Sequence, residues 1–185
     1  MAIIDGRALA GTTLLDTAGG SMRLGDLWET TPAVVVWLRH FGCLFCKEQT
    51  AEFRARRGEI EVRGARLAFV GNGGRRYATG FRDEFCSECT VLTDPELTSY
   101  KLIGARGGLV NTLGPQAWAA GIRAFRRGAR QQKTQGHPFQ QGGVLVVEAG
   151  GRVAYSYLSK AAGDHPRVNE VIAAIPAPAT AAVAR

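Results

Sequence analysis

Ala33-Val34-Val35-Val36-Trp37-Leu38 is an unbroken apolar run, and Cys43-Leu44-Phe45-Cys46 follows it after a short gap. A β-branched run with no alternation is typical of a central strand that is buried on both faces, as in a parallel sheet. Phe41–Gly42 breaks the run, and the pattern then predicts a helix from about Leu44 to Arg63 that ends at Gly64. The two cysteines therefore fall where a strand passes into a helix.

The rest of the chain continues this alternation of strand and helix, and it closes with a hairpin and a last helix. A β-α-β-α-β order implies right-handed crossovers and parallel strands. The further elements that we expect are strands over 65–70 and 90–92, helices over 75–85 and 96–103, a hairpin of strands over 144–147 and 152–157, and a helix over 165–175.

This order resembles the thioredoxin arrangement, in which the hairpin strands join the sheet antiparallel. We predict an α/β, thioredoxin-like fold with βαβ units, central parallel strands, a C-terminal β-hairpin and a closing helix. Residues 1–175 are expected to form one domain, and the Ala/Pro-rich residues 176–185 a flexible tail. Residues 1–31 read as short strands and turns with a short helix over 24–28, and the Gly-, Gln- and Arg-rich residues 105–141 hold one expected helix over 116–127.

Composition and charge limit the classes of protein that fit the sequence. The 185 residues are 45% hydrophobic and 21% charged, and the net charge of +7 favours acidic ligands or partners. The basic residues are scattered without interleaved aromatics, which argues against nucleic-acid binding. The apolar run over 32–38 is too short to cross a membrane, and the N-terminus lacks the basic-then-apolar pattern of a secretory signal. We therefore expect a cytoplasmic protein with neither nucleic-acid nor membrane partners.

The spacing of Cys43 and Cys46 predicts redox chemistry. A helix N-terminus carries unpaired N–H groups and partial positive charge, which stabilise a thiolate. Such a position lowers a cysteine pKa from about 8.5 into roughly the 3.5–7.5 range, and the second thiol can attack a mixed disulfide formed by the first. Arg39 and His40 stand just upstream and are expected to add positive charge.

Four motifs carry a resemblance to a known family: Trp37 to Cys46, Leu92-Thr93-Asp94-Pro95, Gln141-Gly142-Gly143-Val144 and Gly163-Asp164-His165-Pro166. They resemble the peroxiredoxin-like 2 family, the AhpC/TSA-like antioxidant proteins, and the resemblance extends from about residue 20 to 175. It implies a thioredoxin-like fold and reduction of a peroxide or endoperoxide, and some members are described as prostamide/prostaglandin F synthases. We expect no cofactor and an external thiol reductant such as thioredoxin or glutathione, and a homodimer is compatible with the sequence. The family usually has Pro where this chain has Leu44.

The sequence supports two assignments of the first nucleophile. Peroxiredoxins carry a Thr-x-x-Cys motif, in which Cys43 would occupy the Thr position and Cys46 would attack the peroxide. Thioredoxins instead attack with the first cysteine of the pair. For a peroxide we favour Cys46 as the attacking residue with Cys43 resolving, and for disulfide exchange the roles reverse.

Sheet direction predicts the neighbours of the pair, because parallel strands end at the same edge as Cys43. Gly142 and Gly143 start an antiparallel strand at that edge and could admit a substrate close to sulfur. Asp164 reads chiefly as a cap of the last helix, and His165 as a candidate proton donor. Gly71 to Gly74 and Asp94–Pro95 belong to this edge as well. The basic residues Arg123, Arg126, Arg127, Arg130 and Lys133 form either a solvated helix face or a lid over the site.

Cys86 and Cys89 make a second C-x-x-C between a helix and a strand, and the topology places them at the opposite edge of the sheet. We favour plain packing of these residues over a local disulfide or redox sensor. A zinc site built from both pairs is disfavoured because a strand of five or six residues spans roughly 17–20 Å.

The leading functional hypothesis is a thiol-dependent oxidoreductase that acts on a peroxide, endoperoxide or disulfide. The alternatives are a pathway-specific redox enzyme with a dedicated small-molecule substrate, and a non-enzymatic zinc-binding or scaffold module.

Overall fold

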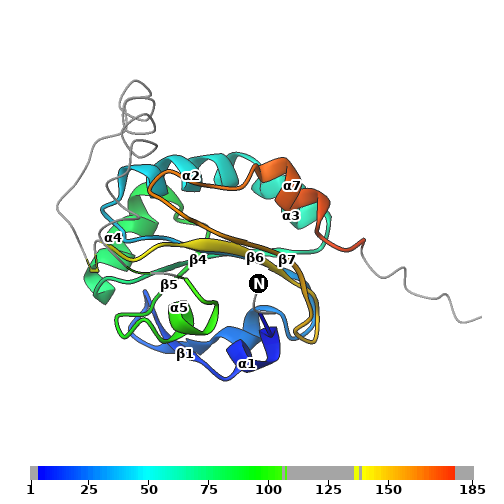
Figure 1. Cartoon of the computed structure of the whole chain (residues 1–185), viewed down its shortest axis with the longest axis horizontal. Coiled ribbons are helices and arrows are strands. Elements are labelled where there is room, and N and C mark those ends of the chain that lie inside the picture. The colour runs from blue at the N-terminus through cyan, green and yellow to red at the C-terminus, as the bar shows by residue number, and fades with distance from the viewer. Residues whose placement is uncertain (1–3, 106, 108–135, 138, 178–185) are drawn as a thin grey trace, which may run out of the picture.

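A computed structural model describes residues 4–105, 107, 136–137 and 139–177 of the chain. A single seven-stranded sheet lies between two layers of helices, with α2, α3, α4 and α7 on one face and α1 and α5 on the other (Figure 1). The elements are α1 (Gly6–Ala10), β1 (Thr13–Asp16), β2 (Ser21–Arg23), the 3-10 helix η1 (Leu24–Leu27), β3 (Ala33–Trp37), α2 (Leu44–Ala55), α3 (Arg57–Val62), β4 (Arg66–Gly71), α4 (Arg75–Phe85), β5 (Thr90–Thr93), α5 (Thr98–Leu102), β6 (Gly143–Val147), β7 (Val153–Leu158) and α7 (Val168–Ala173).

The strand order is β2-β1-β5-β4-β3-β6-β7, so β3 lies inside the sheet. β3 pairs parallel with β4, and β4 pairs parallel with β5. β6 pairs antiparallel with both β3 and β7, as predicted for the hairpin. Because the parallel strands end at one edge and β6 begins there, the turn after β3 and the start of β6 meet at that edge.

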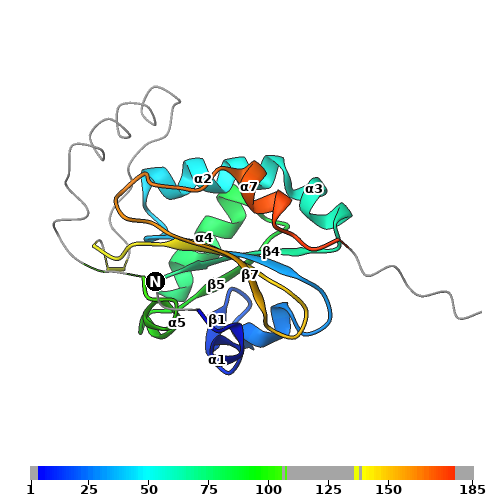
Figure 2. The same cartoon turned by 45° about the vertical axis from the view of Figure 1, so that its right-hand side comes forward.

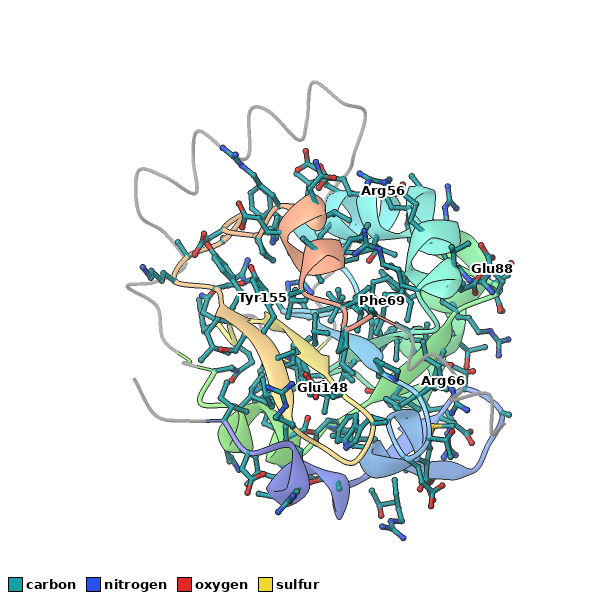
Figure 3. All side chains as sticks on the ribbon, turned by 90° about the vertical axis from the view of Figure 1, so that its right-hand side faces the viewer. Arg56, Arg66, Phe69, Glu88, Glu148 and Tyr155 are labelled. Carbon is teal, nitrogen blue, oxygen red and sulfur yellow. A yellow bond between two sulfur atoms is a disulfide. The ribbon has the colours of Figure 1, made fainter. Side chains whose placement is uncertain are left out.

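The unbroken apolar run of β3 is explained by burial on both faces, since all five of its residues are buried. Val34 and Val36 pack toward the α2 and α4 layer together with Phe69 of β4, which lies in the interior of the molecule (Figure 3). Val35 and Trp37 face the α1 and α5 layer. Strand alternation thus divides one apolar stretch between two cores.

The helices differ from the prediction in two main places. The helix expected over 44–63 is interrupted at Arg56, whose φ of −108° and ψ of 10° end α2 and begin α3. Phe53 and Ile60 on the two parts remain fully buried, so burial of one apolar face continues across the break. α1 was not predicted, although Asp5 accepts a hydrogen bond from the Arg7 N–H as its N-cap.

Other predictions agree closely with the structure. α4 spans the predicted residues, and Gly64 has the positive φ of 75° expected after a helix. No helix within the described part of the chain has the length and apolar character needed to cross a membrane. The helix expected over 116–127, the basic residues from Arg123 to Lys133 and most of the predicted tail lie outside the described residues.

Candidate active site

The first cysteine pair lies at the junction that the sequence predicted, with Cys43 as the N-cap of α2 and Cys46 in its first turn. The turn is closed by the Cys43 N–H, which donates to the His40 carbonyl oxygen at 3.1 Å. Both residues are free thiols, and both are buried, with exposed fractions of 2% and 1%. The chain therefore places two reduced sulfurs at the edge where β3 ends.

The Cys43 sulfur is the more acidic of the two. A hydrogen bond from the Cys46 thiol lowers the pKa of Cys43 to about 6, although burial alone would raise it. The positive charge of Arg39 and the backbone N–H groups of Cys46 and Phe45 act in the same direction as the Cys46 thiol. At neutral pH most of Cys43 is therefore thiolate.

Cys46 shows the opposite behaviour. Burial, and then the neighbouring Cys43 sulfur, raise its pKa well above the usual value for a thiol. The Arg39 N–H donates to the Cys46 Sγ at 3.3 Å and partly offsets this effect. Cys46 is thus a protonated thiol that donates to the Cys43 thiolate.

Arg39 supplies the positive charge predicted upstream of the pair. Its Nη1 lies 3.9 Å from the Cys43 Sγ, and its Nε donates to the Gln140 carbonyl oxygen at 3.3 Å. The Asn72 side-chain amide donates to the Arg39 carbonyl oxygen, and the Asn72 Oδ1 accepts from the His137 N–H at 2.9 Å. Residues from two separate segments, the turn after β4 and the stretch before β6, therefore hold Arg39 against the sulfurs.

The prediction that His40 adds positive charge is wrong. His40 is buried, and this burial together with the charge of Arg39 lowers its pKa to about 4. The imidazole is therefore neutral at physiological pH, and only Arg39 of the two residues carries charge.

Gly142 approaches the site, but the space beside it is already filled. A Cβ on Gly142 would lie 2.1 Å from the Trp37 carbonyl oxygen and 3.5 Å from the Arg39 nitrogen. A Cβ on Gly143 would lie 2.7 Å from the Tyr157 carbonyl oxygen. The two glycines therefore allow the backbones of β3 and β7 to approach closely, and their role in admitting a substrate stays a prediction.

The connection between β7 and α7 passes beside the start of α2 in both Figure 1 and Figure 2, as the sheet direction predicted. Asp164 does not cap α7, because Arg167 is the N-cap of that helix. Asp164 instead accepts hydrogen bonds from the Tyr157 hydroxyl and from the Lys160 N–H, the latter at 2.7 Å. His165 is half-buried on the same connection, and its role as a proton donor stays a prediction.

The second cysteine pair is a disulfide between Cys86 and Cys89, whose Cα atoms lie 5.3 Å apart. This separation falls within the range that a disulfide requires. Our favoured interpretation, plain packing of two free thiols, is therefore wrong. Glu88 of the intervening pair lies at the outer edge of the molecule (Figure 3) and forms an ion pair with Arg57 at 3.7 Å.

Two further features bear on ligand binding. The described residues contain no group of three or more His, Cys, Asp or Glu side chains that could hold a metal ion. A groove of about 130 Å³ borders the turn before Cys43, and the tilted rings of Phe41 and Phe81, 5.4 Å apart, line it. Its other lining residues are Arg76, Tyr77, Gly80, Glu84 and Phe85.

Comparison with known families identifies the chain. The family model described as AhpC/TSA antioxidant enzyme matches residues 52–161, which is more than half of the chain. The chain belongs to the AhpC/TSA antioxidant enzyme family. It is accordingly a peroxiredoxin-like thiol oxidoreductase, in agreement with the resemblance noted in the sequence.

Three relatives illustrate the family. Thioredoxin-like protein AAED1, chloroplastic, from Arabidopsis thaliana is 29% identical over 170 residues, which cover 87% of this chain and 68% of that protein. Prostamide/prostaglandin F synthase from Salmo salar is 29% identical over 174 residues, covering 89% of this chain and 85% of that protein. Peroxiredoxin-like 2C from Bos taurus is 25% identical over 175 residues, covering 89% and 77%.

Solved structures confirm the thioredoxin-like fold of the AhpC/TSA chain. Peroxidoxin BcpB from Mycobacterium tuberculosis superposes with a TM-score of 0.68 at 16% identity, covering 94% of this chain and 96% of that one. A Xanthomonas campestris peroxiredoxin Q mutant gives a TM-score of 0.67 at 11% identity, covering 94% and 95%.

The sequence did not predict that Asn72 and Gln140 hold Arg39. Asn72 lies in the Gly71 to Gly74 turn, which the sequence placed at this edge. The sequence therefore predicted where Asn72 lies but not its hydrogen bond to Arg39. Gln140 acts through its backbone carbonyl oxygen, which carries no side-chain signal.

Proposed function

We propose that this AhpC/TSA chain reduces a peroxide substrate with Cys43 as the first nucleophile and Cys46 as the resolving thiol. The observation that carries the proposal is the opposite shift of the two pKa values, lowered to about 6 for Cys43 and raised for Cys46. The thiolate is the reactive form of cysteine, so the first attack falls to Cys43. This reverses the roles that the sequence favoured for a peroxide.

The reaction proceeds in two balanced steps. The Cys43 thiolate attacks one oxygen of the O–O bond, the sulfur is oxidised to a sulfenic acid, and the other oxygen leaves as an alkoxide that takes up a proton. The Cys46 thiol then loses its proton and attacks the Cys43 sulfur, so that an S–S bond forms and water leaves. An external thiol reductant supplies two electrons and two protons to return the pair to its reduced form.

Arg39 supports the first step as a neighbouring positive charge. Its Nη1 lies 3.9 Å from the Cys43 Sγ, where a guanidinium stabilises both the thiolate and the negative charge that develops on the leaving oxygen. The groove next to Phe41 offers an aromatic surface for the apolar part of an organic peroxide. With an endoperoxide the Cys43 sulfur instead becomes bonded to one oxygen of the opened ring while the other oxygen takes up a proton, and attack by Cys46 then releases that oxygen as an alcohol rather than as water. The name of the Salmo salar relative supports a prostaglandin-like substrate.

Disulfide exchange is the second candidate. An acidic first cysteine with a resolving cysteine three residues later is the arrangement that thiol–disulfide exchange uses. A zinc or scaffold module has less support, because Cys86 and Cys89 are bonded to each other and offer no thiolate ligands.

We further propose that residues 1–175 act as one domain and that the enzyme works in a reducing compartment. A cysteine pair that an external thiol returns to its reduced form supports a reducing environment such as the cytoplasm, whereas the Cys86–Cys89 disulfide is an indication against it. The Arabidopsis thaliana relative is chloroplastic by name, and comparing localisation of the tagged protein with that relative distinguishes the two compartments. A thiol reductant protein is the expected partner, and gel filtration of the reduced and oxidised protein tests for a homodimer.

The test uses reduced protein treated with one equivalent of hydrogen peroxide or an organic hydroperoxide, followed by dimedone trapping and mass mapping. We expect wild type to form the Cys43–Cys46 disulfide, Cys46→Ser to accumulate dimedone on Cys43, and Cys43→Ser to trap none. Dimedone on Cys46 in Cys43→Ser, with none on Cys43 in Cys46→Ser, would contradict the assignment. The double variant Cys86→Ala and Cys89→Ala is the matched control and should keep peroxide turnover.

A further inference from the structure

The peptide group between Leu38 and Arg39 is hydrogen-bonded at both ends. On one side, the Arg39 N–H donates to the Cys46 Sγ at 3.3 Å. On the other side, the Leu38 carbonyl oxygen of the same peptide group lies 2.6 Å from the Tyr100 hydroxyl. One amide therefore connects the phenol of Tyr100 to the sulfur of Cys46.

The Tyr100 hydroxyl is a donor in this arrangement. It is fully buried, and burial, followed by the charges at Cys46 and Asp94, raises its pKa well above the usual value. Its second neighbour, the Val70 carbonyl oxygen at 3.1 Å, already accepts from the Leu38 N–H at 2.7 Å. The Tyr100 hydroxyl therefore donates its hydrogen bond to the Leu38 carbonyl oxygen, which is the closer acceptor.

Tyr100 is held in place by a separate set of buried contacts. The Ser99 N–H and hydroxyl both donate to the Asp94 Oδ2, at 2.7 and 2.6 Å, at the start of α5. The Trp37 Nε1 donates to the Ser99 Oγ at 3.0 Å. α5 is thus fastened to the last residue of β3, directly before the peptide that Tyr100 contacts.

We propose that Tyr100 is a positioning residue for Cys46, whose hydroxyl orients and polarises the Leu38–Arg39 peptide and makes the Arg39 N–H a stronger donor to the Cys46 sulfur. A donor on a carbonyl oxygen withdraws electron density from its amide, and hydrogen bonds in a chain strengthen one another. Tyr100 touches neither sulfur, so it acts through the amide.

This inference rests on the proposed role of Cys46 as the resolving thiol. In that step Cys46 gives up its proton, its sulfur attacks the sulfur of the oxidised Cys43, and water leaves. Negative charge on the Cys46 sulfur is stabilised by the Arg39 N–H, whereas the first attack by Cys43 does not use this peptide. Tyr100 should therefore speed resolution, and it should affect the first attack less, because it reaches Cys43 only through the hydrogen bond from the Cys46 thiol.

The direct test measures the pKa of Cys46 by thiolate absorbance in the Cys43→Ser background, where Cys46 is the remaining free thiol while Cys86 and Cys89 stay bonded. The charged and titratable groups that bear on Cys46 in wild type are Cys43, Arg39 and Tyr100. Adding Tyr100→Phe should raise the pKa of Cys46 by roughly 0.3–1, from the net contribution of one hydrogen bond. Tyr157→Phe, which removes the phenol hydrogen bond to Asp164, is the matched control and should leave the pKa of Cys46 unchanged.

In the otherwise wild-type protein, Tyr100→Phe should slow resolution roughly two- to tenfold and change the rate of sulfenic acid formation on Cys43 by less than about twofold. Lower thermal stability with an unchanged pKa of Cys46 would overturn the inference, because that is the result of packing alone. If Tyr100→Phe does not fold, 3-fluorotyrosine at position 100, a stronger donor, should lower the pKa of Cys46, and no change or a rise would overturn the inference. A shift in the pKa of Cys46 without peroxide turnover in wild type would leave the inference standing and refute the proposed function.

Discussion

Replacing Cys46 by alanine or by serine separates its two effects on Cys43. The Cys46 thiol hydrogen bond is the largest influence that lowers the pKa of Cys43 to about 6. Alanine removes the donor, whereas serine keeps a hydroxyl at nearly the same place. The pair of variants therefore tests whether the donor, rather than the presence of a second sulfur, holds Cys43 as a thiolate.

The size of the effect follows from the energy of a hydrogen bond to a charged group, about 1.5–3 kcal/mol. This corresponds to a rise of roughly 1–2 in the pKa of Cys43, to roughly 7–8, in Cys46→Ala. The thiolate fraction at pH 7 should then fall from about nine-tenths to between roughly one half and one-tenth. Cys46→Ser should keep the pKa of Cys43 within about 0.5 of the wild-type value.

The assay is a pH titration of thiolate absorbance, which needs no reagent to reach the buried sulfur. In both variants Cys43 is the remaining free thiol, because Cys86 and Cys89 form a disulfide. The two titration curves should differ between about pH 5 and 9, which is roughly one unit beyond the expected pKa values on either side, and should converge at higher pH. Coinciding curves, or a pKa near about 8.5 in Cys46→Ser, would refute the reasoning.

Three further predictions concern stability. Burial lowers the pKa of His40 to about 4, so between about pH 6.5 and pH 4 the unfolded state binds more protons than the folded state. The free energy of unfolding should therefore fall by up to about 3 kcal/mol as the pH drops through this range. His40→Gln should flatten this part of the stability–pH profile, measured by denaturant unfolding at each pH. Gly142→Ala drives a Cβ into a backbone oxygen at 2.1 Å and should cost more than about 2 kcal/mol in chemical denaturation, whereas Gly58→Ala, with open space around it, should stabilise by roughly 0.5–1 kcal/mol. Removing the Cys86–Cys89 disulfide by a double alanine substitution should lower the free energy of unfolding by about 2 kcal/mol, since the closed loop is short, and an unchanged melting temperature would count against it.

The parts of the fold that the sequence predicted best are those with strong local signals. β3 was recognisable because a short run of β-branched residues without alternation, followed by a glycine turn, favours a strand covered on both faces. α4 was bounded correctly because a glycine turn precedes it and a cysteine ends it. The break at Arg56 had no such signal, because the apolar face of Phe53 and Ile60 continues across it.

Only those features of the site that follow from strand direction were predicted from the sequence. Strand direction placed Cys43, Asp94 and Gly142 near one edge, and the structure brings the turn after β3, the start of α5 and the start of β6 together there. The neutrality of His40 depends on how deeply the fold buries it, which the residue type does not reveal. Tyr100 lies 62 positions from Leu38 in sequence, and a contact at that separation leaves no periodic pattern to read.

Burial of the cysteine pair has a kinetic consequence. With exposed fractions of 2% and 1%, the two sulfurs react with a dissolved oxidant only after the surface opens locally. When opening is slower than the attack that follows it, the oxidation rate stops rising with oxidant concentration and levels off at the opening rate, even for an oxidant that never binds. An oxidant that binds and itself induces the opening then reacts faster than one that must wait for it. A reactive thiolate can therefore stay inert toward most of the small oxidants that surround it.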